Sequence, residues 1–262
     1  MIGYSKGFAK TCLAVHVAAQ LTACALLWYH TNLSTVYAIP LGWIAGVLLA
    51  DFASGMAHFH LDNYGFIDYV TAKMPGLPFI AQYVAHHDFP DLILSYDYWT
   101  TNSDGLYATC ITMTLTSLAC LFYDIHNGFS EWSAFMIFAL SSLQMMFFMN
   151  SQTNQFHYWS HQLNPPIFVR WLQKAGILLT FEEHRRHHID PKTCYCISSG
   201  ILNPFLEKIG WWGFLNTVFT AIIGEDKIKQ QSNAEFRVER VKQWERELGV
   251  VSATSLGSKK TQ

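Results

Sequence analysis

Four long stretches of the chain carry almost no charge. Cys12–Tyr29, Leu106–Tyr123 and Ser133–Met149 contain no Asp, Glu, Lys or Arg, and Val36–Ala57 contains only Asp51. Each stretch is about as long as the roughly 17–25 residues that cross the hydrocarbon core of a bilayer. The pattern therefore predicts an all-α polytopic membrane protein with about four transmembrane helices.

Two later segments are apolar but also contain charged residues. Residues 168–179 form an amphipathic pattern, and residues 205–223 combine Trp211 and Trp212 with Glu207 and Lys208. We expect the second segment to lie in the membrane interface, because a fifth span would divide the basic residues between the two sides. A short helix is expected over residues 234–248, inside a charged tail.

The placement of basic residues predicts the orientation. Only 14% of the residues are charged, against about 25% in soluble domains. With four spans, all 17 Lys and Arg fall on the side that holds both termini, whereas residues 30–35 and 124–132 on the other side hold none. Basic loops stay cytosolic, so we expect cytosolic termini. The net charge of −2 and the absence of a basic patch argue against a nucleic-acid partner.

Eight histidines and one aspartate gather near the cytosolic ends of these stretches, at spacings typical of metal ligands. His58 and Asp62, like His157 and His161, are four residues apart, so that on a helix each pair shares one face. The full candidate set is His58, Asp62, His86, His87, His157, His161, His184, His187 and His188.

The size of this set predicts two metal ions. Imidazole is the commonest protein ligand for a transition metal, and one ion takes three or four protein ligands. A structural zinc site or a membrane zinc hydrolase would leave most of these histidines unexplained. A histidine-rich dimetal site beside a membrane indicates oxygen chemistry on a lipid, in which the metal oxidises a C–H bond and the protein positions the chain.

Four nearby residues are open candidates. His60 lies two residues from His58, so on a helix it faces away, but it could still act as a ligand or support one. Asp190 could orient His188 or simply mark a helix end. Cys194 and Cys196 face the cytosol, where thiols stay reduced, and a C-x-C pair is only a weak metal motif. The remaining cysteines lie in the apolar stretches and are expected to be small buried hydrophobes.

Three sequence strings carry a family resemblance. They are SGMAHFHLDNYG (54–65), TNQFHYWSHQ (153–162) and EEHRRHHIDPKTCYCISSGILNPFLEKIGWW (182–212), with AHHDFP (85–90) at the expected place between the first two. In this order and at these separations, they resemble the Kua-type lipid desaturases, over about residues 36–212. That family includes animal enzymes that form the vinyl ether of plasmalogens and a plant plastid enzyme that desaturates phosphatidylglycerol acyl chains.

The resemblance implies a chemistry and a set of ligands. It implies two iron ions, O2 as co-substrate, a phospholipid substrate, and electrons from cytochrome b5 and its reductase. All nine candidates match motif positions. The implied organisation is an N-terminal segment with the first span (1–35), a lipid desaturase domain (36–224) and a charged cytosolic tail (225–262). Animal members have histidines where this chain has Tyr96 and Lys192 and an acidic residue where it has Ala85; His60 could replace a missing ligand.

The sequence leaves two classes of lipid substrate open. NPFLEKIGWW and TTNSDG favour the ether-lipid reaction, whereas DNYG and YCISSG favour the acyl reaction. We expect the ether reaction, since the first ten residues do not resemble a plastid transit segment. Lys259 and Lys260 near the C-terminus resemble an endoplasmic reticulum retrieval signal. A lipid hydroxylase shares the same metal chemistry, and an inactive metal-bound membrane scaffold is the alternative of another class.

Overall fold

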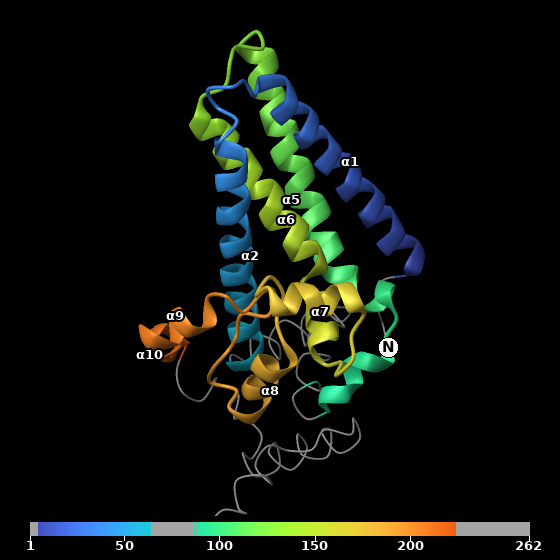
Figure 1. Ribbon diagram of the computed structural model, residues 1–262, viewed down its shortest axis with the longest axis vertical. Coiled ribbons are helices and arrows are strands. Elements are labelled where there is room, and N and C mark those ends of the chain that lie inside the picture. The colour runs from blue at the N-terminus through green and yellow to red at the C-terminus, as the bar shows by residue number, and fades with distance from the viewer. Residues whose placement is uncertain (1–4, 64–85, 87–88, 224–262) are drawn as a thin grey trace, which may run out of the picture.

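The long apolar stretches form a bundle of four helices. The computed structural model describes residues 5–63, 86 and 89–223. Its long helices are α1 (Lys6–His30), α2 (Ala38–Asn63), α5 (Tyr98–His126) and α6 (Ala134–Ser160), which run along one another in Figure 1. All four are long and apolar enough to cross a membrane, and the described residues contain no strand. The prediction of an all-α protein with four spans is confirmed.

The sequence sets where three of these helices begin. A side-chain oxygen at the N-cap accepts a hydrogen bond from the backbone N–H three residues later, which satisfies one of the open donors of the first turn. Such caps precede α1, α5 and α6, and the residues that supply them are Ser5, Asp97 and Ser133.

Small residues allow α2 and α6 to pack closely. A Cβ atom added at Gly42 would lie 2.6 Å from the carbonyl oxygen of Phe138, and one at Gly46 would lie 2.4 Å from that of Ser142. Glycines four residues apart let two membrane helices approach backbone to backbone. Elsewhere, α1 packs along α5, and α5 packs along α6.

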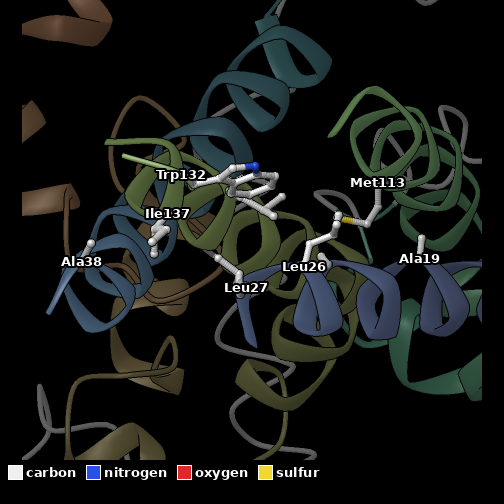
Figure 2. Packing of buried hydrophobic residues seen from close by; sticks show 9 residues of the cluster. Ala19, Leu26, Leu27, Ala38, Met113, Trp132 and Ile137 are labelled. Atoms are coloured by element: carbon white, nitrogen blue, oxygen red, sulfur yellow. The ribbon is translucent and has the colours of Figure 1, made fainter. Parts of the chain in front are cut away.

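The bundle end formed by the 31–37 and 127–133 connections has its own buried core. Leu26 and Leu27 of α1 pack with Met113 of α5, Trp132 and Ile137 (Figure 2). Beside them, the Asp124 carboxylate is 2.8 Å from Nε2 of His30 and accepts a 2.7 Å hydrogen bond from the Trp132 indole. These contacts tie α1, α5 and the start of α6 together.

Short helices cover the opposite end, where the histidines lie. These are η1 (Pro90–Ser95), α7 (Ile167–Lys174), α8 (Phe181–Ile189), α9 (Asn203–Lys208) and α10 (Trp211–Ile223), and in Figure 1 they gather below the bundle. The N-terminal end of α1 is at this end too, because Lys6 forms an ion pair with Asp97.

Two of these helices differ from the expected segments. The amphipathic helix α7 ends at Lys174, five residues earlier than the pattern over 168–179 indicates. The apolar segment 205–223 is broken at Gly210, whose φ is +67°, so that α10 has only 13 residues and is too short to span a bilayer. A fifth span is therefore not formed by the described residues. The expected helix over 234–248 lies outside them.

Candidate metal centre

Five histidines form the first of two buried donor groups. His157 lies in the last turn of α6, His161 caps that helix, and His184 and His188 lie one turn apart on α8. Together with His86, they offer donor atoms that all lie within 4.8 Å of one another.

Four of the five imidazoles of this first group, those of His157, His161, His184 and His188, bring their Nε2 atoms close together. Nε2 of His184 is 2.7 Å from that of His157, 2.8 Å from that of His161 and 3.0 Å from that of His188. A neutral imidazole has one N–H and one lone pair, so that a single proton cannot serve three such contacts. A shared cation can serve all of them.

His58, Asp62 and His187 form the second group. Oδ2 of Asp62 is 3.4 Å from Nε2 of His58 and 3.2 Å from Nε2 of His187. His187 thus belongs to the second group, whereas His184 and His188 on the same helix belong to the first. Three residues of one short helix therefore contribute to both groups.

Backbone carbonyl groups orient the histidines of the second group. Nδ1 of His58 donates to the carbonyl oxygen of Tyr195 (3.1 Å), and Nδ1 of His187 donates to that of Thr193 (2.7 Å). With the proton on Nδ1, a neutral ring keeps its lone pair on Nε2, which faces Asp62. Such outer hydrogen bonds are typical of histidine ligands.

The segment that supplies these carbonyl groups is anchored on α2. The Asp51 carboxylate is fully buried and accepts hydrogen bonds from the backbone N–H groups of Ser199, Gly200 and Leu202 at 2.8–3.0 Å. In the sequence, Asp51 stands out only as the lone charge in its stretch, and this anchoring role was not predicted. An isolated acid in an apolar run was the available signal, because a buried charge requires partners.

The donor chemistry of the two groups fits transition-metal ions. Burial, and then the neighbouring imidazoles, lower the pKa of His184 well below its usual 6.5, so that this ring is neutral and can act as a ligand. Two imidazoles on one ion, with metal–nitrogen bonds of about 2.1 Å, place their nitrogens roughly 3.0–3.4 Å apart. The contacts within the first group, 2.7–3.3 Å, are close to this range.

The other candidates lie elsewhere. His60 donates from Nδ1 to the carbonyl oxygen of Met56 (2.8 Å) and packs against Phe219, outside both groups. Asp190 caps α8 and accepts from the backbone N–H of Lys192, as a helix stop does. Cys194 and Cys196 are buried but belong to neither group. His87 and Ala85 lie outside the described residues.

A pocket of about 350 Å³ lies between α2, α5 and α6, and several of its lining residues are neighbours in sequence of donor-group residues. Ala57 and Leu61, which line it, each precede a residue of the second group on α2, and Asn154 lies three residues before His157 on α6. The rest of the lining is mostly small or apolar, and Asp104 is its one ionisable side chain. The pocket can hold a hydrocarbon chain with one polar end near the histidines.

Comparison with known proteins identifies a family that this chain matches. A family model described as a lipid desaturase domain matches residues 47–230, more than half of the chain. The chain is 34% identical to plasmanylethanolamine desaturase 1 of Mus musculus over 207 residues, which cover 76% of this chain and 69% of that protein. No solved structure matches significantly.

Two further relatives come from a bacterium and a plant. The chain is 27% identical to plasmanylethanolamine desaturase of Myxococcus xanthus, over 84% of this chain and 76% of that protein. It is 32% identical to the chloroplastic fatty acid desaturase 4 of Arabidopsis thaliana, over 69% of this chain and 51% of that protein. The family match over residues 47–230 extends across both donor groups and the pocket.

Proposed function

This chain belongs to the lipid desaturase family, and we propose that it desaturates the sn-1 alkyl chain of an ether phospholipid to a vinyl ether. The observation that carries the proposal is its similarity to the mouse and Myxococcus plasmanylethanolamine desaturases, which extends over more than two thirds of each of them. The pocket beside the histidines supports it, since a desaturase must hold an alkyl chain against its oxidising centre.

We propose that each donor group holds one iron ion. His86, His157, His161, His184 and His188 would hold the first, and His58, Asp62 and His187 the second. His87 is proposed as a further ligand from the sequence alone. Bound iron would supply the oxidising power, with O2, two protons and two external electrons taking two hydrogens from the chain and leaving two waters. The carbonyl groups of Tyr195 and Thr193 keep two of the rings aimed inward.

The protein's other contribution is position. α2 carries His58 and Asp62 of the second group, and α6 carries His157 of the first. Both helices also form walls of the pocket, so that a chain lying there would be held beside the donor atoms. Fixing a reactive bond against the oxidant lowers the barrier by removing its freedom to move away. Burial of every histidine in both groups excludes water and protects the oxidising centre from side reactions.

The second candidate is desaturation of a phospholipid acyl chain. It is favoured by the 32% identity to the chloroplastic fatty acid desaturase 4. The metal chemistry would be the same, and the two reactions differ in which carbons the pocket brings to the donor groups. Electron delivery by cytochrome b5 and its reductase, with the site on the cytosolic face of the endoplasmic reticulum, completes the proposal.

The test is lipid mass spectrometry of cells that lack their own ether-lipid desaturase. Expression of this chain should produce acid-labile vinyl-ether phospholipids, two hydrogens lighter than their alkyl precursors, and His184→Ala should produce none. New double bonds in acyl chains with an unchanged ether pool would identify the second candidate. A hydroxylated ether lipid would identify a hydroxylase, and no product from well-expressed, iron-loaded protein supplied with reductase would contradict desaturation.

A further inference from the structure

Asp104 is an acidic side chain in an unusual place. It lies on α5, half-buried, and lines the pocket between α2, α5 and α6. No hydrogen bond or ion pair joins its carboxyl group to any residue in the described part of the chain. A carboxylate in low-polarity surroundings is costly without a partner, and an ionisable residue within a membrane helix marks a functional site by default.

The depth of Asp104 matches the polar end of a phospholipid. α5 has 29 residues, which makes it about 43 Å long, whereas a hydrocarbon core is about 30 Å thick. A helix centred on the bilayer therefore extends about 6 Å beyond each boundary. Asp104 is the seventh residue of α5, about 9 Å from its start. It thus lies within one helical turn of the boundary, where glycerol and headgroup atoms are found.

The pocket extends from this level into the hydrocarbon region. Its lining on α5 continues from Asp104 to Thr112, about 12 Å deeper along the helix. On α6, it reaches from Asn154 to Phe147. A lipid that occupies this pocket would place its alkyl chain beside Thr112 and Phe147 and its polar end beside Asp104.

The proposed reaction requires this arrangement. In an ether phospholipid, the two carbons that become the vinyl group are the first two of the chain, next to the glycerol oxygen. They can reach the donor groups only if the polar end of the lipid is held close to the histidines. Asn154 shares the pocket with Asp104 and lies three residues, about one turn, before His157, so that Asp104 lies at the end of the pocket nearer to His157.

We propose that Asp104 selects the headgroup by pairing with the primary ammonium of an ethanolamine phospholipid. The inference rests on the proposed function, because it takes a phospholipid to be the occupant of the pocket. An ammonium can donate three hydrogen bonds, and charge-assisted bonds to a carboxylate are about twice as strong as neutral ones. A choline headgroup carries the same charge but cannot donate N–H. A glycerol headgroup leaves the phosphate unbalanced, which the carboxylate repels.

A binding experiment tests the inference without turnover. Wild-type protein and variants are placed in nanodiscs with equal amounts of 1-alkyl-2-acyl phosphoethanolamine, phosphocholine and phosphoglycerol lipids, and the lipids retained after extraction are counted by native mass spectrometry. The wild type should retain the ethanolamine lipid roughly tenfold over the choline lipid, a preference of about 1.4 kcal/mol. Asp104→Asn should reduce the preference to within twofold. Asp104→Glu should keep most of it.

Asp91→Asn is the matched control, because Asp91 is exposed on η1 at the same end of the molecule. Its lipid preference should equal that of the wild type. Unchanged ethanolamine preference in Asp104→Asn would overturn the inference. So would equal retention of all three lipids by the wild type.

Turnover separates this inference from the proposed function. With the ethanolamine lipid as substrate, Asp104→Asn should raise KM roughly tenfold and leave kcat within twofold. With the choline lipid, which loses only the charge attraction, KM should rise less and kcat should again stay within twofold. Equal falls in kcat for both lipids would indicate a structural role and overturn the inference. If no lipid yields a vinyl ether while the headgroup preference in binding depends on Asp104, the proposed function fails and the inference stands.

Discussion

His184 makes close contacts with three other histidines of the first donor group. Its Nε2 atom lies within 3.0 Å of three other imidazole nitrogens, and its ring is fully buried. A neutral histidine cluster of this density costs desolvation and offers few hydrogen bonds in return. Its presence is understandable when a cation occupies the centre, so that the cost of burying these rings is offset by ligation.

Substitution of one ligand from each group should abolish activity. His161→Ala and His187→Ala each remove one donor, and we expect desaturation to fall below about 1% of wild type, since outer partners alone are worth about 10–100-fold. Iron content, measured by plasma mass spectrometry on purified protein, should fall below the two ions per chain that we propose for the wild type. His126→Ala is the control, because His126 is exposed at the other end of α5. Full activity in either ligand variant would contradict the metal assignment.

The Cys194 thiol should be unreactive in the folded protein. Burial and its hydrogen bond to Glu207 raise its pKa from 9.0 to about 12, so that at pH 8 the thiolate fraction falls roughly a thousandfold. Peptide mapping after iodoacetamide treatment at pH 8 should find Cys194 unmodified, and modified once the protein is denatured. Because the folded pKa is raised, the stability contribution of this thiol is present below pH 9 and is lost as the pH rises toward 12. Rapid alkylation of the native protein would contradict this environment.

At the scale of elements, α2 has two functions. It carries His58 and Asp62 of the second donor group, and it also carries the small residues that let it pack on α6. Two α6 histidines join the first group, so that the α2–α6 contact also sets how the two donor groups face each other.

Filling this contact should destabilise the bundle. In Gly46→Ala, the new methyl group would lie 2.4 Å from the carbonyl oxygen of Ser142, and overpacking of this kind costs about 1–3 kcal/mol. The thermal midpoint in detergent should fall, as followed by fluorescence-detected size-exclusion chromatography. Gly213→Ala is the control, since nothing lies within 4 Å of its added Cβ. Equal thermal midpoints for the two variants would contradict the close contact between α2 and α6.

Loss of the Asp51 anchor should loosen the second donor group. Asp51→Asn leaves a single acceptor oxygen and adds an NH2 group facing the N–H donors of Ser199, Gly200 and Leu202. We expect a cost of at least about 2 kcal/mol and reduced iron content, because Tyr195 in the same segment orients His58. Asp91→Asn should match the wild type in both measurements. Normal iron content with normal stability would contradict the anchoring role.

The sequence predicts the long helices well and the short helices around the histidines less well. Stretches with almost no charge located all four spans, because charged side chains are costly in the hydrocarbon region. They underestimated helix length: α5 begins at Tyr98 rather than Leu106, since Asp97 caps a polar first turn that hydropathy does not detect. The break at Gly210 was not predicted, because a single residue with positive φ does not change the apolar pattern of the segment.

The sequence indicated the residues of the two donor groups but not how they divide between the groups. Spacing of four residues correctly paired His157 with His161 and His184 with His188 on common faces. The placement of His187 with His58 and Asp62 depends on how α8 packs against α2 and on the carbonyl group of Thr193. These are contacts between residues far apart in sequence, which periodicity within one helix cannot reveal.

For the whole molecule, both donor groups and the start of α1 lie at one end of the bundle, as the pair Lys6–Asp97 shows. The positive-inside rule predicts that this end faces the cytosol. A cysteine introduced at exposed Asp91 should react with an impermeant maleimide in sealed microsomes. One at exposed Glu131, in the opposite connection, should react only after permeabilisation. The unmodified chain gives the background, and the reverse pattern would contradict the orientation.

The hydrogen bonds from residues 197–202 to Asp51 and Ser54 also limit how this protein can be recombined. The hydrogen-bonded residues are 143–151 positions apart in the chain. The helix supplies a carboxylate to backbone N–H groups of the segment, and the segment supplies a carbonyl group that orients His58. A chimera that takes α2 from one relative and residues 193–203 from another would separate parts that fit only as a pair. Productive crossovers between family members should therefore move both segments together or leave both in place.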